Sequence, residues 1–230
     1  QMDCTLGSVE PNLAQVGGFA EQAERLSAEL VVFPECALTG YFVGDKLAEL
    51  AEPVDGRNMR QLAEISRRHR LHVAIGLILF DAGKYYDAQA LFGPDGSLLG
   101  LYRKIHLFAT ERDTYAAGTE PLVVETAFGR VGLSICYDLI FPGFIRRLVD
   151  LGADIVINST NWISDAYQRD TWGWSGRTTQ GLAATRALEN VAFVAMANRV
   201  GREQGFRSHG WSCIASPSGQ LLAALNDGEC

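Results

Sequence analysis

Three residues that could form a nucleophilic active site each follow an apolar segment. Glu35 comes after residues 30–33, Lys104 after residues 97–102, and Cys136 after residues 130–135. Functional side chains often lie where strands end. A thiol, with an ordinary pKa of about 8.5, becomes a nucleophile when a carboxylate takes its proton, and a lysine can stabilise the oxyanion that follows. Together the three residues predict covalent catalysis through Cys136.

Each of these residues alone also has an ordinary structural explanation. A glutamate after a strand is usually a solvated loop residue, and a lysine beside an arginine is usually at the surface. A cysteine at a strand end is usually a small buried hydrophobe. His106 would allow a Cys-His dyad, although a packing or hydrogen-bonding role is favoured. Asp138 is an alternative acid, although local hydrogen bonding near a turn is its commoner role.

Aromatic residues gather in the segment after residue 158. Trp162, Trp172 and Trp174 occur there, with Asn161 and Tyr167 nearby. Because side chains just beyond a strand end often shape a pocket, Asn161 and Trp162 are candidate substrate-binding residues. Packing of a long loop against the body of the protein is an equally weighted alternative.

The sequence predicts no metal and no cofactor. His69, His72 and His209 are scattered without metal-ligand spacing. The glycines form no phosphate-binding loop, so no nucleotide cofactor is implied.

Apolar periodicity predicts the elements that must position these residues. Helical spacing occurs at residues 12–30, 59–70, 144–151 and 178–190. Strands are predicted at residues 30–33, 72–80, 85–92, 97–102, 121–126, 130–135, 154–158, 191–198, 210–215 and 220–224. Residues 94–100 and 217–223 share the pattern Pro-x-Gly-x-Leu-Leu, which predicts two equivalent hairpins. Helices alternating with strands and hairpins indicate an α/β layered domain with mixed sheets.

Composition excludes several classes of protein. The 230 residues are 47% hydrophobic and 20% charged with a net charge of −7, typical of a globular domain and unfavourable for a nucleic-acid partner. The arginines of residues 57–70 indicate a solvated helix face. The absence of a long apolar run argues against a membrane partner. The cysteines are odd in number and scattered, which predicts a reduced, cytoplasmic protein: Cys4, Cys36, Cys136, Cys213 and Cys230.

Three sequence blocks resemble the signature blocks of the nitrilase superfamily, the carbon-nitrogen hydrolases. They are FPECALTGY at residues 33–41, YRKIHLF at residues 102–108 and GLSICYD at residues 132–138. Residues 115–118, 152–154 and 186–190 match supporting segments, so the resemblance covers nearly the whole chain. It implies a four-layer αββα sandwich with two mixed β-sheets.

The resemblance also implies the roles of individual residues. Cys136 would be the nucleophile, Glu35 the general base and Lys104 the cationic stabiliser of the tetrahedral intermediate. Glu111 matches a second glutamate that orients the lysine and the substrate, and the backbone N–H of Tyr137 would complete the oxyanion hole. Attack on an amide would release ammonia and leave a thioester that water hydrolyses.

The dipeptide after the nucleophile, Tyr137-Asp138, favours an amidase acting on a small-molecule amide. An N-carbamoyl amino acid or amine hydrolase and a nitrilase are alternatives, as is the glutaminase domain of a synthetase. An inactive nitrilase-like assembly module is an alternative from another class. The resemblance further implies a homodimer or larger homo-oligomer.

Two departures from the family pattern affect these expectations. Gly143 stands after Phe141-Pro142, where similar proteins usually carry a glutamate. Residues 1–230 are expected to form a single carbon-nitrogen hydrolase domain that lacks the first and last strands of the full-length protein.

Overall fold

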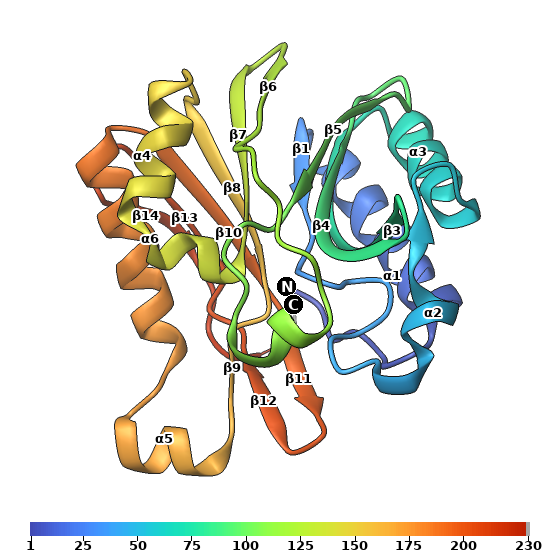
Figure 1. Ribbon diagram of the computed structural model, residues 1–230. Helices are drawn as coiled ribbons and strands as arrows, with labels where there is room; N and C mark the ends of the chain where they lie inside the picture. Colours follow the sequence, from blue (N-terminus) through green and yellow to red (C-terminus); the bar gives the residue numbers. More distant parts are fainter. Residues whose placement is uncertain (229–230) are drawn as a thin grey trace.

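Two β-sheets face each other, and helices cover the outer face of each (Figure 1). The computed structural model describes residues 1–228, so Cys230 lies outside the described residues. The first sheet has the order β1-β3-β4-β5, with β2 paired to β3: β1 (Leu30–Val32), β2 (Glu52–Pro53), β3 (His72–Asp81), β4 (Lys84–Phe92) and β5 (Leu98–Arg103). The second has the order β14-β13-β10-β8-β7-β6: β6 (Val123–Thr126), β7 (Gly129–Ile135), β8 (Ile155–Thr160), β10 (Phe193–Asn198), β13 (Cys213–Ala215) and β14 (Leu221–Ala224). Both sheets contain parallel and antiparallel pairs, and the predicted four-layer αββα sandwich is confirmed.

The long helices form the two outer layers. Helices α1 (Val9–Arg25) and α3 (Arg57–His69) cover the first sheet, and α4 (Pro142–Asp150) and α6 (Gly176–Asn190) cover the second (Figure 1). Short helices lie in the connections: η1 (Gly44–Lys46), α2 (Leu47–Leu50), η2 (Ala109–Asp113), η3 (Cys136–Ile140) and α5 (Ala166–Trp172).

Helix α1 is shorter than the sequence pattern predicts, and α4 contains the departure from the family pattern at Gly143. The helix predicted for residues 12–30 ends earlier, at Arg25, because Ser27 has a φ of 56°, a left-handed conformation that an α-helix cannot continue. At Gly143, in the first turn of α4, a Cβ atom would meet nothing within 4 Å. The departure at this position therefore leaves no packing defect.

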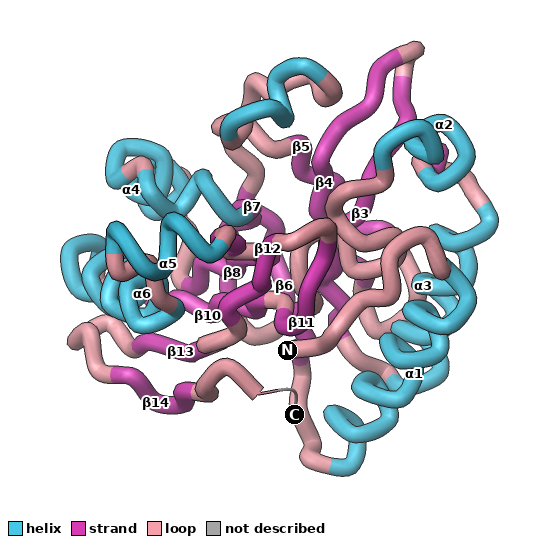
Figure 2. The backbone as a smooth tube through the Cα atoms, turned by 90° about the horizontal axis from the view of Figure 1, so that it is seen from below, coloured by secondary structure: helices cyan, strands magenta, loops and turns pink. Residues whose placement is uncertain are grey.

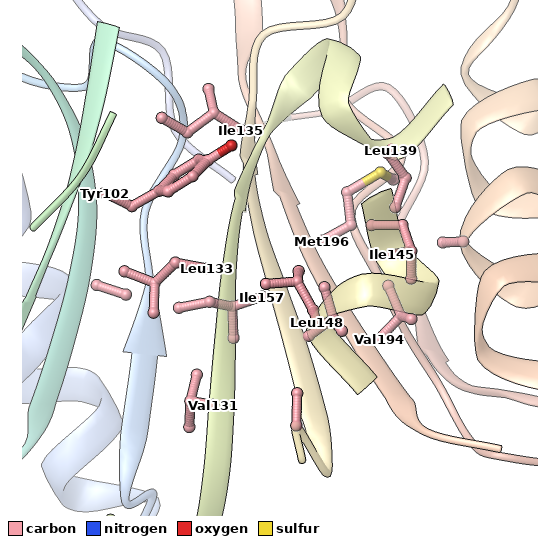
Figure 3. Close-up of a cluster of buried hydrophobic side chains, with 14 of the residues drawn as sticks. Tyr102, Val131, Leu133, Ile135, Leu139, Ile145, Leu148, Ile157, Val194 and Met196 are labelled. Atoms are coloured by element: carbon pink, nitrogen blue, oxygen red, sulfur yellow. The ribbon is translucent and has the colours of Figure 1, made fainter. Parts of the chain in front are cut away.

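The core between the sheets explains the alternating pattern of β7. Figure 3 shows Val131, Leu133 and Ile135 on the side of β7 that faces the first sheet, with Tyr102 reaching toward them from β5. Residues two apart on a strand share a face, so all three side chains enter one layer. Burying each of them stabilises the fold by about 1.5–3 kcal/mol. This layer fixes the spacing of the two sheets whose ends carry the candidate catalytic residues.

The two predicted equivalent hairpins are present. The β4-β5 turn has hydrogen bonds from Gly93 N to Ser97 O and from Gly96 N to Gly93 O, both 2.8 Å. The β13-β14 turn repeats this arrangement from Ser216 to Gln220, again at 2.8 Å. Gly96 and Gly219 have φ values of 83° and 77°, which glycine adopts without steric cost.

A small third sheet, which the sequence patterns did not predict, lies at the lower end of the sandwich in Figure 1, the end from which Figure 2 is viewed. It contains β9 (Ile163–Ser164), β11 (Val200–Glu203) and β12 (Phe206–His209). These strands are short and partly polar, so apolar periodicity carries little signal there. Among residues 1–228, no helix has both the length and the apolar character needed to cross a membrane.

Candidate active site

Glu35, Lys104 and Cys136 converge between the two sheets. Glu35 follows β1, Lys104 follows β5 and Cys136 begins η3 directly after β7. Glu35 and Lys104 are completely buried, and Cys136 is 8% exposed. The charges of Glu35 and Lys104 both act on the Cys136 thiol. The structure therefore brings together the three residues that the sequence analysis placed at separate strand ends.

The Lys104 ammonium contacts three carboxylates. Its Nζ donates to Glu35 Oε1 at 2.5 Å, to Glu111 Oε1 at 2.8 Å and to Asp87 Oδ2 at 3.0 Å. Burial alone would lower the pKa of Lys104, but the neighbouring carboxyl groups of Asp87, Glu35 and Glu111 more than offset this, and the pKa lies well above its usual value. Lys104 is therefore a fixed cation held at the centre of these groups.

Glu35 is held from two sides by the backbone. Its Oε2 accepts a hydrogen bond from Asn161 N at 2.9 Å. The chain around it lies directly against β3, where a Cβ atom on Gly76 would be 2.5 Å from Glu35 Cα. Only glycine allows this close approach, so Gly76 helps to position Glu35.

Cys136 has a backbone conformation that is rare for a side-chain-bearing residue. Its φ is 42°, in the left-handed region, at the point where β7 turns into η3. Burial raises the pKa of the Cys136 thiol well above its ordinary value, the charge of Glu35 raises it further, and Lys104 lowers it. The resting side chain is therefore a neutral thiol beside a carboxylate. The next residue, Tyr137, lies in the first turn of η3, where backbone N–H groups lack helical partners.

A pocket opens over Cys136. Its cavity volume is about 20 Å³, roughly the space of one water molecule, and it is partly open to solvent. Its lining residues are Tyr41, Phe108, Cys136, Tyr137, Asn161, Trp162, Ile163 and Trp174. No carboxylate, amine or guanidinium is among these residues, so the substrate end of the site is uncharged.

The aromatic segment after β8 contributes part of this pocket. Trp162 and Trp174 stack with ring centres 5.7 Å apart. Trp172 and Tyr167 are exposed and lie outside the pocket lining. The segment thus forms a wall with Trp162 and Trp174, while its other aromatic residues remain at the surface.

Tyr41 is a pocket residue that the sequence analysis did not single out. Its hydroxyl donates to Glu111 Oε1 at 2.5 Å. Glu203 of β11 accepts hydrogen bonds from the backbone N–H groups of Tyr41 and Phe42, at 3.0 and 3.1 Å. Buried Arg199 pairs with Glu203. The unpredicted third sheet therefore holds the loop that links the pocket to the carboxylate cluster.

Asp138 and His106 support the turn that carries Cys136. Completely buried Asp138 accepts hydrogen bonds from Tyr102 OH at 2.8 Å and from the backbone N–H groups of His106 and Ile135 at 3.0 Å. The His106 ring contacts Asp138 Oδ1 at 2.7 Å and stacks on Phe141. Both residues have the hydrogen-bonding role that the sequence analysis favoured.

Replacing Asp138 with alanine is expected to destabilise the fold by about 3 kcal/mol, because several buried donors lose their acceptor. The free energy of unfolding in urea measures this loss. The control is Asp150→Ala on α4, whose side chain is half exposed and pairs with Arg146; we expect a change within about 0.5 kcal/mol there. Equal losses in the two variants would contradict a supporting role for Asp138.

Asp87 is another residue of the site that sequence reasoning missed. It lies inside β4 and is 1% exposed. The available signal was a carboxylate within an apolar strand segment, since such a group is rarely buried without a partner. Oxygen atoms of Glu35, Asp87 and Glu111 lie within 4.8 Å of one another, close enough to surround a cation, and Lys104 Nζ contacts all three.

This chain is similar to known proteins in both sequence and fold. The family model for carbon-nitrogen hydrolases matches residues 1–229. An (R)-stereoselective amidase from Pseudomonas sp is 36% identical over 195 residues, covering 84% of this chain and 68% of the relative. An omega-amidase from Homo sapiens is 30% identical over 230 residues, covering 95% of this chain and 80% of the relative.

A solved structure extends the likeness to the fold. The crystal structure of an amidase from Nesterenkonia sp. superposes with a TM-score of 0.87 at 24% identity, covering 99% of this chain and 84% of that one. At this identity the likeness supports the fold alone. The family match over nearly the whole chain, with relatives of 30% identity or more, confirms the resemblance: the chain belongs to the carbon-nitrogen hydrolases of the nitrilase superfamily.

Proposed function

We propose that this protein is an amidase that converts a small carboxamide to a carboxylic acid and ammonia through a thioester on Cys136. The observation that carries the proposal is the buried contact of Lys104 with Glu35 beside Cys136, at the floor of an uncharged pocket. The presence of amidases among the curated relatives supports an amide, over other carbon-nitrogen compounds, as the substrate of this protein.

In the acylation step, the Glu35 carboxylate takes the proton of the Cys136 thiol as sulfur attacks the amide carbonyl carbon. Negative charge then develops on the carbonyl oxygen, and the Lys104 ammonium and the Tyr137 backbone N–H stabilise it. As the carbon-nitrogen bond breaks, protonated Glu35 gives its proton to the leaving nitrogen. Ammonia departs, the acyl group remains on sulfur, and Glu35 is ionised again.

In the deacylation step, Glu35 takes a proton from water as the water oxygen attacks the thioester carbon. Collapse of the second tetrahedral intermediate breaks the carbon-sulfur bond and releases the carboxylic acid. The Cys136 thiolate recovers its proton from Glu35. Glu111 positions Lys104 through both steps, since it contacts Nζ at 2.8 Å.

The pocket lining favours an uncharged acyl group. Aromatic side chains form most of its wall, and they offer favourable contact to flat or apolar groups. A carboxylate at the far end of the substrate would lose its hydration without gaining a cationic partner there. We therefore expect neutral aliphatic or aromatic carboxamides to be better substrates than amides of dicarboxylic acids.

Mass spectrometry of the intact protein with a panel of amides, N-carbamoyl compounds and nitriles tests this function. We expect an acyl adduct on Cys136 and ammonia release with neutral carboxamides, and a kcat/KM at least about tenfold lower for the matched amide that carries a distal carboxylate. Modification confined to Cys4, Cys36 or Cys213 would contradict the mechanism. Faster turnover of the carboxylated amide would contradict the substrate class alone.

The same panel separates the alternative functions. Preferred turnover of N-carbamoyl compounds or nitriles would indicate those hydrolase activities, and turnover confined to glutamine would indicate a glutaminase domain. No adduct with any compound would favour an inactive assembly module. Self-association into a homodimer or larger oligomer stays a prediction, which light scattering during size-exclusion chromatography tests.

A further inference from the structure

Asp87 contacts Lys104 but has no part in the steps proposed above. Its Oδ2 accepts a hydrogen bond from Lys104 Nζ at 3.0 Å, and the residue is 1% exposed. Together with Glu35 and Glu111 it places three carboxylates around one ammonium. Full ionisation would leave two negative charges uncompensated in a buried cluster. Such charges are costly away from water, and neighbouring carboxylates then bind a proton instead.

The hydrogen-bond donors around each carboxylate indicate where that proton lies. Glu35 has a donor on each oxygen, and Glu111 accepts from three donors, and these hydrogen bonds favour the ionised form of each. Burial raises the pKa of Glu111, although Lys104 lowers it. Asp87 accepts only from Lys104, and its Oδ1 has no hydrogen-bond partner among the described residues. Asp87 is therefore the carboxylate least stabilised in its ionised form.

We propose that Asp87 is a neutral carboxylic acid in the resting enzyme and that its O–H donates a hydrogen bond to Glu35, which stays ionised. Burial raises the pKa of Asp87 well above its ordinary value; Lys104 lowers it, and the neighbouring charge of Glu35 raises it again. Asp87 is thus a positioning residue that holds Glu35 and leaves Lys104 with two anionic partners. The effect of Asp87 on catalysis rests on the proposed function of Glu35. The protonation of Asp87 does not depend on that function.

The other titratable groups that face Asp87 supply no compensating charge. They are the Cys36 thiol, next to Glu35, and the Tyr115 phenol, which follows η2. Burial is the largest cause that raises the pKa of both groups. Both are neutral at neutral pH, so Lys104 is the single cation in contact with Asp87 among the described residues.

The pH dependence of unfolding tests the protonation of Asp87 without any substrate. An unfolded aspartate ionises near a pKa of about 3.9, so folding above that pH must take up a proton at Asp87. Stability of the unsubstituted protein then falls as pH rises, until the pKa of the folded state is reached. Asp87→Asn keeps the shape of the neutral acid and needs no proton. We expect the folding constant of Asp87→Asn, divided by that of the unsubstituted protein, to rise about tenfold per pH unit between about pH 5 and 7.

Asp81→Asn is the matched control for exchanging aspartate for asparagine. Asp81 ends the neighbouring strand β3 and pairs with Arg103 at a partly exposed position. Denaturant unfolding of the three proteins at several pH values gives the folding constants. A flat ratio for Asp87→Asn, or a slope shared with Asp81→Asn, would overturn the proposal, because an ionised Asp87 takes up no proton on folding.

Activity on a carboxamide gives a second test. Asp87→Asn keeps a donor for Glu35 and an acceptor for Lys104, whereas Asp87→Ala removes both. We expect kcat/KM to fall at least about tenfold further in Asp87→Ala than in Asp87→Asn. The reverse order, or equal losses, would contradict a neutral Asp87. Absence of activity in the unsubstituted protein would instead contradict the proposed amidase function, and the unfolding test would still apply.

Discussion

Replacing Cys136 with alanine is expected to lower kcat for amide hydrolysis by at least about 10⁴-fold, because the thioester intermediate can no longer form. Glu35 and Lys104 would remain in place and could still polarise a bound amide. Water would have to attack directly, however, from a site built to hold a sulfur atom. Ammonia release and the disappearance of the acyl adduct in the mass spectrum measure the effect.

The alanine variant should still fold. At a φ of 42°, alanine and cysteine both carry a Cβ atom in the left-handed region, so the substitution adds no new backbone strain at the end of β7. Cys213→Ala is the matched control, because Cys213 is also buried in the second sheet. Burial raises the pKa of Cys213 to about 12. Activity that survived in Cys136→Ala but was lost in Cys213→Ala would place the nucleophile elsewhere.

Much of the fold could be predicted because its strands and helices have strong periodicity. The apolar runs of β3, β4 and β7 are buried along most of their length, and the turn pattern Pro-x-Gly-x-Leu-Leu marks both equivalent hairpins. The third sheet escaped prediction because β9, β11 and β12 are short and bury polar side chains. Through Glu203, this sheet holds the loop at residues 41 and 42 by hydrogen bonds. A local sequence pattern does not predict a contact between residues so far apart in the chain.

The site was predictable where a strand end coincided with a reactive side chain. Glu35, Lys104 and Cys136 satisfy that condition, and the structure places them together. Asp87 lies within a strand, so its inward direction depends on the register of β4 against its neighbours. Tyr41 reaches Glu111 only through the path of an irregular loop. Spacing along the chain therefore identified the reactive groups but not the residues that set their charge.

Glu35→Gln is expected to lower kcat/KM for amides by about 10³-fold, within the range for loss of a general base. The glutamine amide has the shape of the carboxylate but cannot accept the thiol proton. It would also place an N–H₂ group against either Lys104 Nζ or Asn161 N, where the carboxylate now accepts from both. Glu29→Gln, an exposed position just before β1, is the control and should retain activity.

The choice of substrate separates the two tasks assigned to Glu35. An amide leaving group needs a proton as it departs, whereas an aryl ester with the same acyl group does not. Glu35→Gln should therefore lose more activity toward the amide than toward the ester, because the ester requires Glu35 only to take the thiol proton. The two kcat/KM ratios, measured on one preparation, give this comparison. Equal losses would mean that another group protonates the leaving nitrogen, and an unchanged rate on both substrates would mean that the base is not Glu35.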